Sequence, residues 1–237
     1  EKPEYIFNFA AQSMVAESWE FPEQWFTTNA VSTTKLFNKL KDCKFIKKYV
    51  HVTTPEVYGS CSGYITESTP YNPSTPYAAS RAAGDMSLKT FVDNYNFPAV
   101  LTRAANVYGP GQQLYRIIPS TIIYIKQRNV ADATMKIALG GLIGNTYHIS
   151  TKSTITIKNL VALIFDKMEV EFDKYVDITD DRPGKDAAYL LNSDRLRQSL
   201  NWKDSVSLSE GIDNTIEWVE DNFDTLEKQQ FEYIHKK

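Results

Sequence analysis

The sequence predicts an α/β protein in which a doubly wound parallel sheet is accompanied by a smaller α+β lobe. Short apolar runs alternate with longer segments whose apolar residues recur at helical spacing. Several of these runs end in small or hydroxyl-bearing residues, as buried parallel strands do where their carboxyl ends meet a ligand. The pattern changes after residue 112. We therefore expect one domain at 1–112 and a lobe at 113–237, from which some segments return to the first domain.

Three strands and two helices are expected in the first half of the chain. The strands are predicted at residues 5–11, 47–53 and 98–102. The helices are predicted at 17–40, where only Pro22 interrupts the pattern, and at 77–96, where alanines permit a neighbour to approach closely. The segment 59–76 between them is dense in Ser, Thr, Gly and Pro and is expected to form a loop. This alternation indicates parallel strands joined by right-handed crossovers.

The second half of the chain is expected to be mainly helical. A helix at 130–139 ends at a Gly-Gly pair, which is a favourable stop, and a short strand follows at 145–150. Further helices are predicted at 157–167, 193–200 and 208–222.

Composition and charge exclude several classes of protein. The 237 residues carry 26 Lys and Arg against 29 Asp and Glu, and a net charge of −3 lacks the basic footprint of a nucleic-acid binder. No apolar stretch is long enough to span a membrane, and no charged-then-apolar leader opens the sequence. The two cysteines, Cys43 and Cys61, show no metal-ligand spacing. We expect a cytoplasmic protein that binds no nucleic acid, membrane or metal.

Tyr77 and Arg81 lie four residues apart in the second predicted helix and therefore share one face. A fixed positive charge beside a phenol favours the phenolate and lowers the pKa of the Tyr, which would suit it to act as a general base. Taken alone, a Tyr and an Arg at this spacing are more typical of an ordinary amphipathic helix.

The segment Thr-Thr-Pro-Glu-Val-Tyr-Gly at 53–59 stands where the second predicted strand ends. The hydroxyl of Thr54 could hold a substrate oxygen there, and the carboxylate of Glu56 could move a proton. A Thr-rich turn with a solvated Glu explains the same residues if they are taken singly. His51 and His148 occupy strand positions, and we interpret them as core or edge residues, not as catalysts.

Seven segments, taken in order, match the motifs of one known family. They are Phe9-Ala10-Ala11-Gln12-Ser13, Thr28-Asn29, residues 53–59, residues 72–77 leading into Tyr77-x-x-x-Arg81, Arg103 to Pro110, Arg116-Ile117-Ile118-Pro119, and Arg182-Pro183-Gly184-Lys185-Asp186 with Tyr189. On these residues the chain resembles the extended short-chain dehydrogenase/reductase family, and within it the NAD-dependent nucleotide-sugar epimerases and dehydratases of the dTDP-glucose 4,6-dehydratase type. The resemblance covers most of the chain and implies a Rossmann-like fold.

The resemblance implies NAD as cofactor and a nucleotide-diphosphate sugar as substrate. Tyr77 would remove the proton of the sugar C4 hydroxyl, Thr54 would bind that oxygen, and Arg81 would replace the Lys that anchors the nicotinamide ribose. Glu56 would abstract the C5 proton beside the 4-keto group. Cofactor contacts are implied for Phe9, Ala10, Ala11, Gln12, Asn29, Tyr77 and Arg81. Substrate contacts are implied for Ser13, Thr54, Asn106, Arg116, Ile117, Arg182, Lys185 and Tyr189.

Three departures from the family pattern leave the reaction open. The family Lys is Arg81, which keeps the charge but has a wider, planar head. The dehydratase Asp is Pro55, which removes the usual acid for water loss and makes an epimerase or a decarboxylase the alternative. The Gly-rich loop that meets the cofactor pyrophosphate is absent, so a catalytically inactive sugar-nucleotide binder is a second alternative.

The resemblance also implies that parts of a longer protein are missing from this sequence. Family members carry further strands before the segment at Phe9 and an additional segment near residue 129, so we expect a sheet that is incomplete at its N-terminal edge. A homodimer is implied through the helices near 17–40 and 77–96. The aromatic residues expected in the core or in that interface are Trp19, Trp25 and Phe26.

Overall fold

The computed structural model describes residues 1–61, 63–105, 126–176, 190–229 and 235. Contacts divide the chain into two units, which are described separately here. As far as their residues are described, the first unit comprises Glu1–Ala105, Ala133–Ser150 and Arg182–Trp202, and the second comprises Asn106–Asp132, Thr151–Asp181 and Lys203–Lys237. The expected domain boundary at residue 112 lies outside the described residues.

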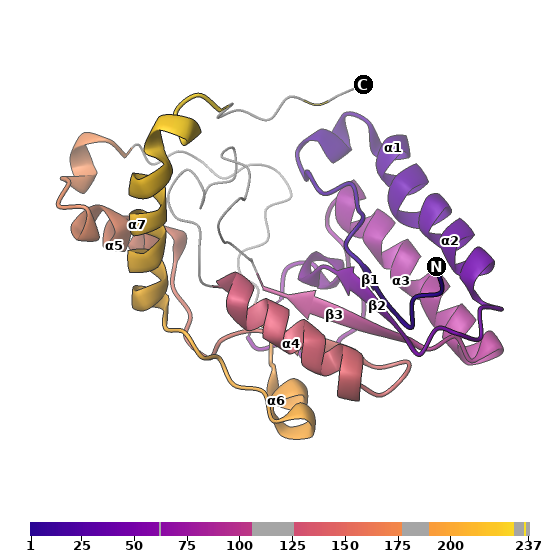
Figure 1. Ribbon diagram of the computed structural model, residues 1–237. Helices are drawn as coiled ribbons and strands as arrows, with labels where there is room; N and C mark the ends of the chain where they lie inside the picture. Colours follow the sequence, from indigo (N-terminus) through magenta and orange to yellow (C-terminus); the bar gives the residue numbers. More distant parts are fainter. Residues whose placement is uncertain (62, 106–125, 177–189, 230–234, 236–237) are drawn as a thin grey trace. The chain divides into compact units, whose positions relative to one another are not determined.

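A parallel sheet forms the centre of the first unit (Figure 1). Its four described strands are β1 (Tyr5–Asn8), β2 (Lys48–Thr53), β3 (Ala99–Ala104) and β4 (Thr146–Ile149). They lie in the order β1-β2-β3-β4, and every neighbouring pair is parallel. The predicted α/β class is therefore confirmed. Because all four strands run the same way, their carboxyl ends meet at one edge, where such sheets bind ligands.

β1 is shorter than the strand predicted at 5–11. It ends at Asn8, whose side-chain Oδ1 accepts a hydrogen bond from the main-chain N–H of Ala10 at 3.1 Å. This local turn takes the amide of Ala10 away from a sheet ladder. The strand prediction is therefore wrong for residues 9–11, which follow the strand and do not belong to it.

The segment predicted as a helix at 17–40 is interrupted only before Pro22, and residues 22–40 are continuously helical although their hydrogen-bond pattern changes twice. Its parts are the 3₁₀ helix η1 (Glu17–Trp19), α1 (Pro22–Phe26), the π-helical segment η2 (Thr27–Ser32) and α2 (Thr33–Leu40). Pro22 has no N–H to donate to a preceding turn, so it stands at the first position of α1, where that group is not needed. The predicted interruption at Pro22 is confirmed. Of the aromatic residues expected here, Trp25 is buried and Trp19 is exposed.

α3 (Pro76–Tyr95) follows the loop and agrees with its prediction to within one residue at each end. It begins at Thr75, whose Oγ1 accepts a hydrogen bond from the N–H of Ala78 at 3.1 Å. It ends at Asn96, which adopts the left-handed conformation with φ of 53°. The next strand, β3, continues two residues beyond the predicted end at residue 102. The extra length places a charged residue, Arg103, inside the sheet.

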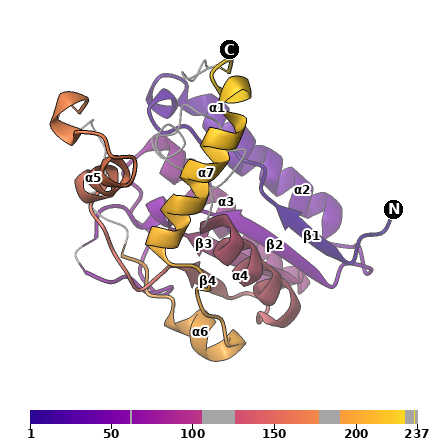
Figure 2. The same ribbon diagram turned by 60° about the vertical axis from the view of Figure 1, so that its left-hand side comes forward.

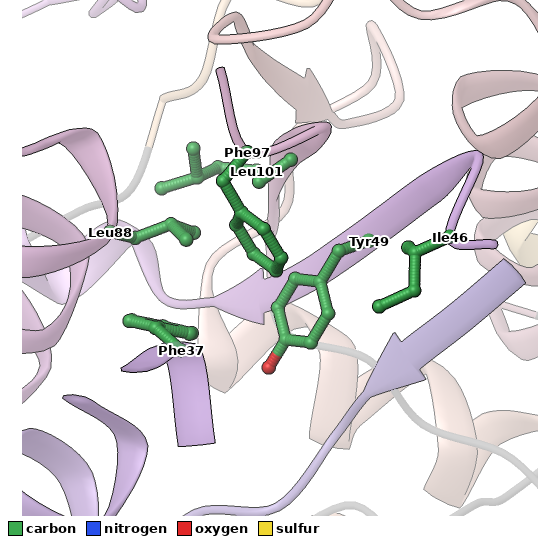
Figure 3. Packing of buried hydrophobic residues seen from close by; sticks show 7 residues of the cluster. Phe37, Ile46, Tyr49, Leu88, Phe97 and Leu101 are labelled. Atoms are coloured by element: carbon green, nitrogen blue, oxygen red, sulfur yellow. The ribbon is translucent and has the colours of Figure 1, made fainter. Parts of the chain in front are cut away.

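Helices cover both faces of the sheet (Figures 1 and 2). α2 and α3 lie on one face, where they enclose an aromatic core with side chains of β2 and β3 (Figure 3). The members of that core are Phe37, Ile46, Tyr49, Leu88, Phe97, Ala99 and Leu101. Residues 133–140 of α4 (Lys126–Gly140) lie on the other face (Figures 1 and 2). The end of this helix is close to β4, because a Cβ added to Gly141 would lie 3.2 Å from both the Ile137 side chain and the Tyr147 ring. The doubly wound arrangement is therefore confirmed.

The later elements follow the predicted order. α4 begins at Lys126, four residues before its predicted start, and passes through residue 129 as continuous helix. The remaining helices are α5 (Ile157–Lys167), the 3₁₀ helix η4 (Phe172–Lys174), α6 (Asp194–Leu200) and α7 (Leu208–Leu226). Within the second unit, α5 and α7 share a small apolar core of Leu160, Ile164 and Ile212.

Candidate active site

Thr54 and Glu56 lie directly beyond the carboxyl end of β2, at a short 3₁₀ helix, η3 (Pro55–Tyr58). Thr54 caps this helix, since its Oγ1 accepts a hydrogen bond from the N–H of Glu56 at 3.2 Å. Pro55 follows at the first helical position, where its fixed φ and missing N–H favour the turn. The cap uses the oxygen of the Thr54 hydroxyl as acceptor, which leaves the hydroxyl proton for donation to a ligand oxygen.

Tyr77 and Arg81 lie on successive turns at the start of α3, and both are buried, with 8% and 4% of their surface exposed. The Nη2 of Arg81 donates a hydrogen bond to the main-chain carbonyl of Val52 in β2. α3 also packs against η3 through apolar side chains of both elements. The helix that carries Tyr77 is therefore fixed against the strand end that carries Thr54 and Glu56.

Asn29 joins the segment after β1 to α3. Its side-chain Oδ1 accepts a hydrogen bond from the N–H of Gln12 at 2.8 Å. Its Nδ2 donates to the carbonyl of Gln12 at 2.9 Å and to the Oγ of Ser80 at 3.0 Å. The side chain of Asn29 is buried, and it holds both main-chain polar groups of Gln12. The structure thus brings these two residues, expected from sequence to contact the cofactor, together with α3.

The rest of the segment 9–13 lies at the surface of the first unit. Phe9 has 66% of its surface exposed, Ala10 and Ser13 are also exposed, and Ala11 is half-buried. An exposed apolar residue next to the carboxyl end of a parallel strand is accessible to a ligand. The other residues with implied substrate contacts lie outside the described residues: Asn106, Arg116, Ile117, Arg182, Lys185 and Tyr189.

Two buried serines beside Tyr77 were missed by the sequence analysis. The Oγ of Ser18 accepts a hydrogen bond from the N–H of Tyr77 at 3.2 Å, across 59 residues of sequence. The Oγ of Ser80 donates to the carbonyl of Tyr77 at 2.7 Å. Ser80 lies within the Tyr77 to Arg81 segment, so its place on the helix was a usable signal. Nothing local to Ser18 predicts a partner so distant in sequence.

A buried polar cluster lies next to the site, between α3, β3 and β4. The Nη2 of Arg103 lies 2.8 Å from the Oδ2 of Asp85, and the guanidinium also donates to the hydroxyls of Tyr58 and Tyr71. The hydroxyl of Tyr58 lies 2.7 Å from the Nε2 of His148. Asp85 stands one turn beyond Arg81 on α3, and this spacing was the available sequence signal for its inward position.

The charges in this cluster are set by burial and by Arg103. Burial lowers the pKa of His148 to about 3, and the positive Arg103 acts in the same direction, so the imidazole is neutral. Its Nδ1 lies 3.1 Å from the carbonyl of Asn192 and must carry the proton, so Nε2 accepts from Tyr58. Burial opposes ionisation of Asp85, but a hydrogen bond from His51 and the charge of Arg103 hold its pKa below the ordinary value.

Both strand histidines occupy core positions, as the sequence predicts. His51 is 2% exposed and His148 is fully buried, and both face the core. Within the described ranges, no group of three or more His, Cys, Asp and Glu side chains could hold a metal ion. In the same part of the chain, no helix has both the length and the apolar character needed to cross a membrane.

Comparison with known proteins gives matches to sugar-nucleotide 4,6-dehydratases. The family model described as GDP-mannose 4,6 dehydratase matches residues 1–145. The dTDP-D-glucose 4,6-dehydratase of Bos taurus is 32% identical over 94% of this chain and 69% of its own length. The dTDP-glucose 4,6-dehydratase of Xanthomonas campestris pv. campestris is 29% identical over 92% of this chain and 72% of its own length.

Solved structures show the same similarity. The structure of DesIV, a dTDP-glucose 4,6-dehydratase from Streptomyces venezuelae with NAD and TYD bound, matches with a TM-score of 0.85 at 28% identity, over 92% of this chain and 74% of that chain. The dTDP-glucose 4,6-dehydratase from Bacillus anthracis in complex with NAD matches with a TM-score of 0.82 at 25% identity, over 94% and 75%. A UDP-glucose 4-epimerase from Thermotoga maritima shares the fold, with a TM-score of 0.85 at 24% identity over 93% and 78%.

Proposed function

The chain belongs to the family of GDP-mannose 4,6-dehydratase and its relatives, the NAD-dependent nucleotide-sugar dehydratases and epimerases, and from this premise we propose that it converts a nucleotide-diphosphate sugar through a 4-keto intermediate, as a dTDP-glucose 4,6-dehydratase does. One observation carries the proposal. Three segments that are distant in sequence are joined near the carboxyl end of β2: η3 with Thr54 and Glu56, α3 with Tyr77 and Arg81, and the segment after β1.

Tyr77 is the proposed proton acceptor for the C4 hydroxyl of the sugar. The hydroxyl of Thr54, whose oxygen is already engaged by the N–H of Glu56, donates its proton to the same C4 oxygen. A positioned acceptor and a positioned donor at one oxygen are the parts that general acid–base catalysis needs. Arg81 contributes a fixed positive charge one turn from Tyr77, buried and anchored on β2.

Glu56 is the proposed base for the second proton. A carbonyl at C4 acidifies the hydrogen on the neighbouring C5, and the carboxylate of Glu56 accepts that proton. Departure of the C6 hydroxyl as water completes an elimination, for which a proton must reach the C6 oxygen. η3 fixes the main chain of Glu56 through the Thr54 cap, so the carboxylate starts from a defined place beyond β2.

The residues fit the nicotinamide and ribose half of NAD. Arg81 carries a buried Nε that has no hydrogen-bond partner in the described part of the chain, and a ribose hydroxyl could accept from such a group. The exposed Phe9 and Ala10 and the main chain of Gln12 provide the adjoining surface. When bound, NAD supplies an acceptor for the hydride that leaves C4 and later a donor that returns this hydride to the sugar.

Pro55 favours epimerisation as the second candidate reaction. It occupies the position at which the 4,6-dehydratases carry an Asp, and its ring offers no proton to a departing hydroxyl. An epimerase of the same family forms the 4-keto sugar without losing water. A decarboxylase of the same family is equally compatible with Pro55. The Pro55→Asp variant tests the dehydratase against both of these alternatives. Gain of water loss in that variant identifies the missing acid, while an unchanged product assigns the site to epimerisation or decarboxylation.

The experiment that tests the proposal uses the whole protein with NAD and a panel of dTDP-, UDP-, GDP- and CDP-sugars. Mass spectrometry and NMR of the products distinguish loss of one water from an epimer of unchanged mass. Conversion of at least one sugar nucleotide, reduced to a small residual rate by Tyr77→Phe, is the expected result. Binding of a sugar nucleotide with no conversion at any member of the panel would identify a catalytically inactive binder and contradict the proposal.

A homodimer in the cytoplasm accompanies this function. Support for the dimer comes from large apolar side chains exposed on α1, η2, α2 and α3: Phe26, Val31, Leu36 and Met86. Support for a reducing compartment comes from the free thiols of Cys43 and Cys61. Light scattering tests the dimer: the wild type should be dimeric, and the Val31→Glu variant should be monomeric. Subcellular fractionation tests the compartment.

A further inference from the structure

Serine hydroxyls hold both main-chain polar groups of Tyr77. Its N–H donates to the Oγ of Ser18 at 3.2 Å, and its carbonyl accepts from the Oγ of Ser80 at 2.7 Å. Both serines are fully buried. A buried hydroxyl that is engaged through both its oxygen and its proton has little rotational freedom. The first turn of α3 is therefore held at two points.

Each serine makes a second hydrogen bond toward the segment after β1. The Oγ of Ser18 donates to the carbonyl of Val15 at 2.6 Å. The Oγ of Ser80 accepts from the side chain of Asn29, and the same amide holds the N–H and the carbonyl of Gln12. Two separate routes thus connect residues 12–15 to the main chain of Tyr77. One passes through Ser18 alone, and the other through Ser80 and Asn29.

The close approach of α3 to η2 keeps the second route short. A Cβ added at Gly84 would lie 2.6 Å from the main-chain carbonyl oxygen of Asn29. Because residue 84 is a glycine and has no side chain, the two backbones lie close together at this crossing. The side-chain amide of Asn29 can therefore reach both Gln12 and Ser80. The route through Ser18 needs no such approach, because Ser18 lies beside Tyr77 itself.

We propose that Ser18 is a positioning residue for Tyr77, which sets the place of the phenol relative to residues 12–15 and hence to the cofactor that Gln12 is expected to contact. The inference rests on the proposed function, in which Tyr77 accepts the proton of the C4 hydroxyl. Ser18 is not a catalytic residue in this proposal, because its buried hydroxyl is engaged by Tyr77 and Val15. It acts through the N–H of Tyr77, which it holds by accepting one hydrogen bond while donating another to Val15.

Loss of this hydrogen bond affects proton transfer more than binding. The expected substrate contacts lie mostly in other segments, so a displaced Tyr77 lowers kcat and leaves KM for the sugar nucleotide little changed. Displacement of a reacting group by about 1 Å reduces the rate on the order of a hundredfold. We therefore expect Ser18→Ala to lower kcat by roughly tenfold to a hundredfold.

The test compares Ser18→Ala and Ser18→Thr with a matched control, Thr90→Ala, in the full NAD-loaded protein. Thr90 also lies on α3 and donates its hydroxyl to a main-chain carbonyl, that of Ser87, at 2.8 Å, but it is exposed. Rates are divided by the amount of folded, NAD-containing protein. Ser18→Ala should lower kcat alone, Ser18→Thr should restore part of it by returning the hydroxyl, and Thr90→Ala should change neither parameter.

A second comparison separates positioning from a general structural effect. In single-turnover measurements, Ser18→Ala should cause no further loss in the Tyr77→Phe background, because the phenol through which it acts is gone. Additive losses would overturn the inference, and so would a Ser18→Ala protein with the wild-type kcat.

Hydrogen exchange makes the test independent of turnover. The amide of Tyr77 should exchange faster in Ser18→Ala than in the wild type, with no substrate present. Unchanged protection of that amide would also overturn the inference. If the wild type converts no sugar nucleotide, the proposed function fails, while the exchange measurement still decides whether Ser18 holds Tyr77.

Discussion

The Nη2 of Arg103 lies 2.8 Å from the Oδ2 of Asp85, and these side chains are 1% and 0% exposed. The pair joins β3 to α3, the helix that carries Tyr77 and Arg81. A buried charge is tolerated only when it is paired and hydrogen-bonded, and the guanidinium meets this condition with two tyrosine hydroxyls in addition to the carboxylate. The pair therefore has structural consequences for the site even though it takes no part in the proposed chemistry.

Removal of one partner should destabilise the protein strongly. Arg103→Met leaves the carboxylate of Asp85 buried without its main cation, and we expect the free energy of unfolding to fall by about 3–5 kcal/mol. Lys89→Ala is the matched control, because it removes an exposed pair between Lys89 and Asp93 at 2.7 Å. Urea unfolding should show a loss below about 1 kcal/mol for the control. Equal losses in the two variants would contradict the structural account.

Acid should destabilise the protein through His148. Burial lowers the pKa of this imidazole from 6.5 to about 3, so between these values the unfolded chain binds a proton that the folded protein does not. The contribution of the neutral, buried His148 to the free energy of unfolding is complete above pH 6.5 and decreases as the pH falls toward 3. We expect a loss of roughly 2 kcal/mol at pH 5 relative to pH 7.5.

The His148→Asn variant is the control for this pH dependence. Its amide can donate to the carbonyl of Asn192 but does not titrate, so its free energy of unfolding should change less over the same range. The carboxylate of Asp85, whose pKa is lowered, contributes only at more acidic pH. If the free energy of unfolding changed equally with pH in the wild type and in the variant between pH 7.5 and 5, the pH dependence would not come from His148.

A methyl group at position 84 should disturb the contact between α3 and η2. In Gly84→Ala the new Cβ meets a main-chain oxygen of Asn29 that cannot turn aside. We expect a net loss of about 1–3 kcal/mol, although Ala is the better helix former. Gly140→Ala is a fair comparison, since its Cβ would meet only the terminal methyl of Leu200, at 3.0 Å. Thermal unfolding should show a clear decrease for the first variant and little change for the second.

Removal of the cap of α3 should affect stability and turnover together. The Oγ1 of Thr75, two residues before Tyr77, accepts from the N–H of Ala78, and Thr75→Ala should cost about 1 kcal/mol. Thr156→Ala removes the equivalent cap of α5, where the Oγ1 accepts from the N–H of Asn159 at 3.2 Å. Both variants should lose stability, but only Thr75→Ala should lower kcat. A fall in kcat for Thr156→Ala alone would contradict this difference.

Local patterns in the sequence were sufficient to predict most of the fold. The strand at 47–53 and the helices at 77–96 and 157–167 were predicted nearly to the residue, because apolar periodicity and end signals act over a few neighbouring positions. The segment at 5–11 was predicted too long, because a side-chain turn at Asn8 competes with strand pairing. The four-residue helix η3 is too short to show any periodicity.

The sequence by itself determined the α/β class and the order of the strands along the chain, and its resemblance to a known family predicted which residues form the candidate site. Only the tertiary structure decided how these residues are held. The bonds from Ser18 to Tyr77 and from Asn29 to Gln12 and Ser80, and the ion pair between Arg103 and Asp85, join segments far apart in sequence. The physical reason is that periodicity reports which face of an element is buried, whereas a buried polar partner is selected by the packing of several elements at once.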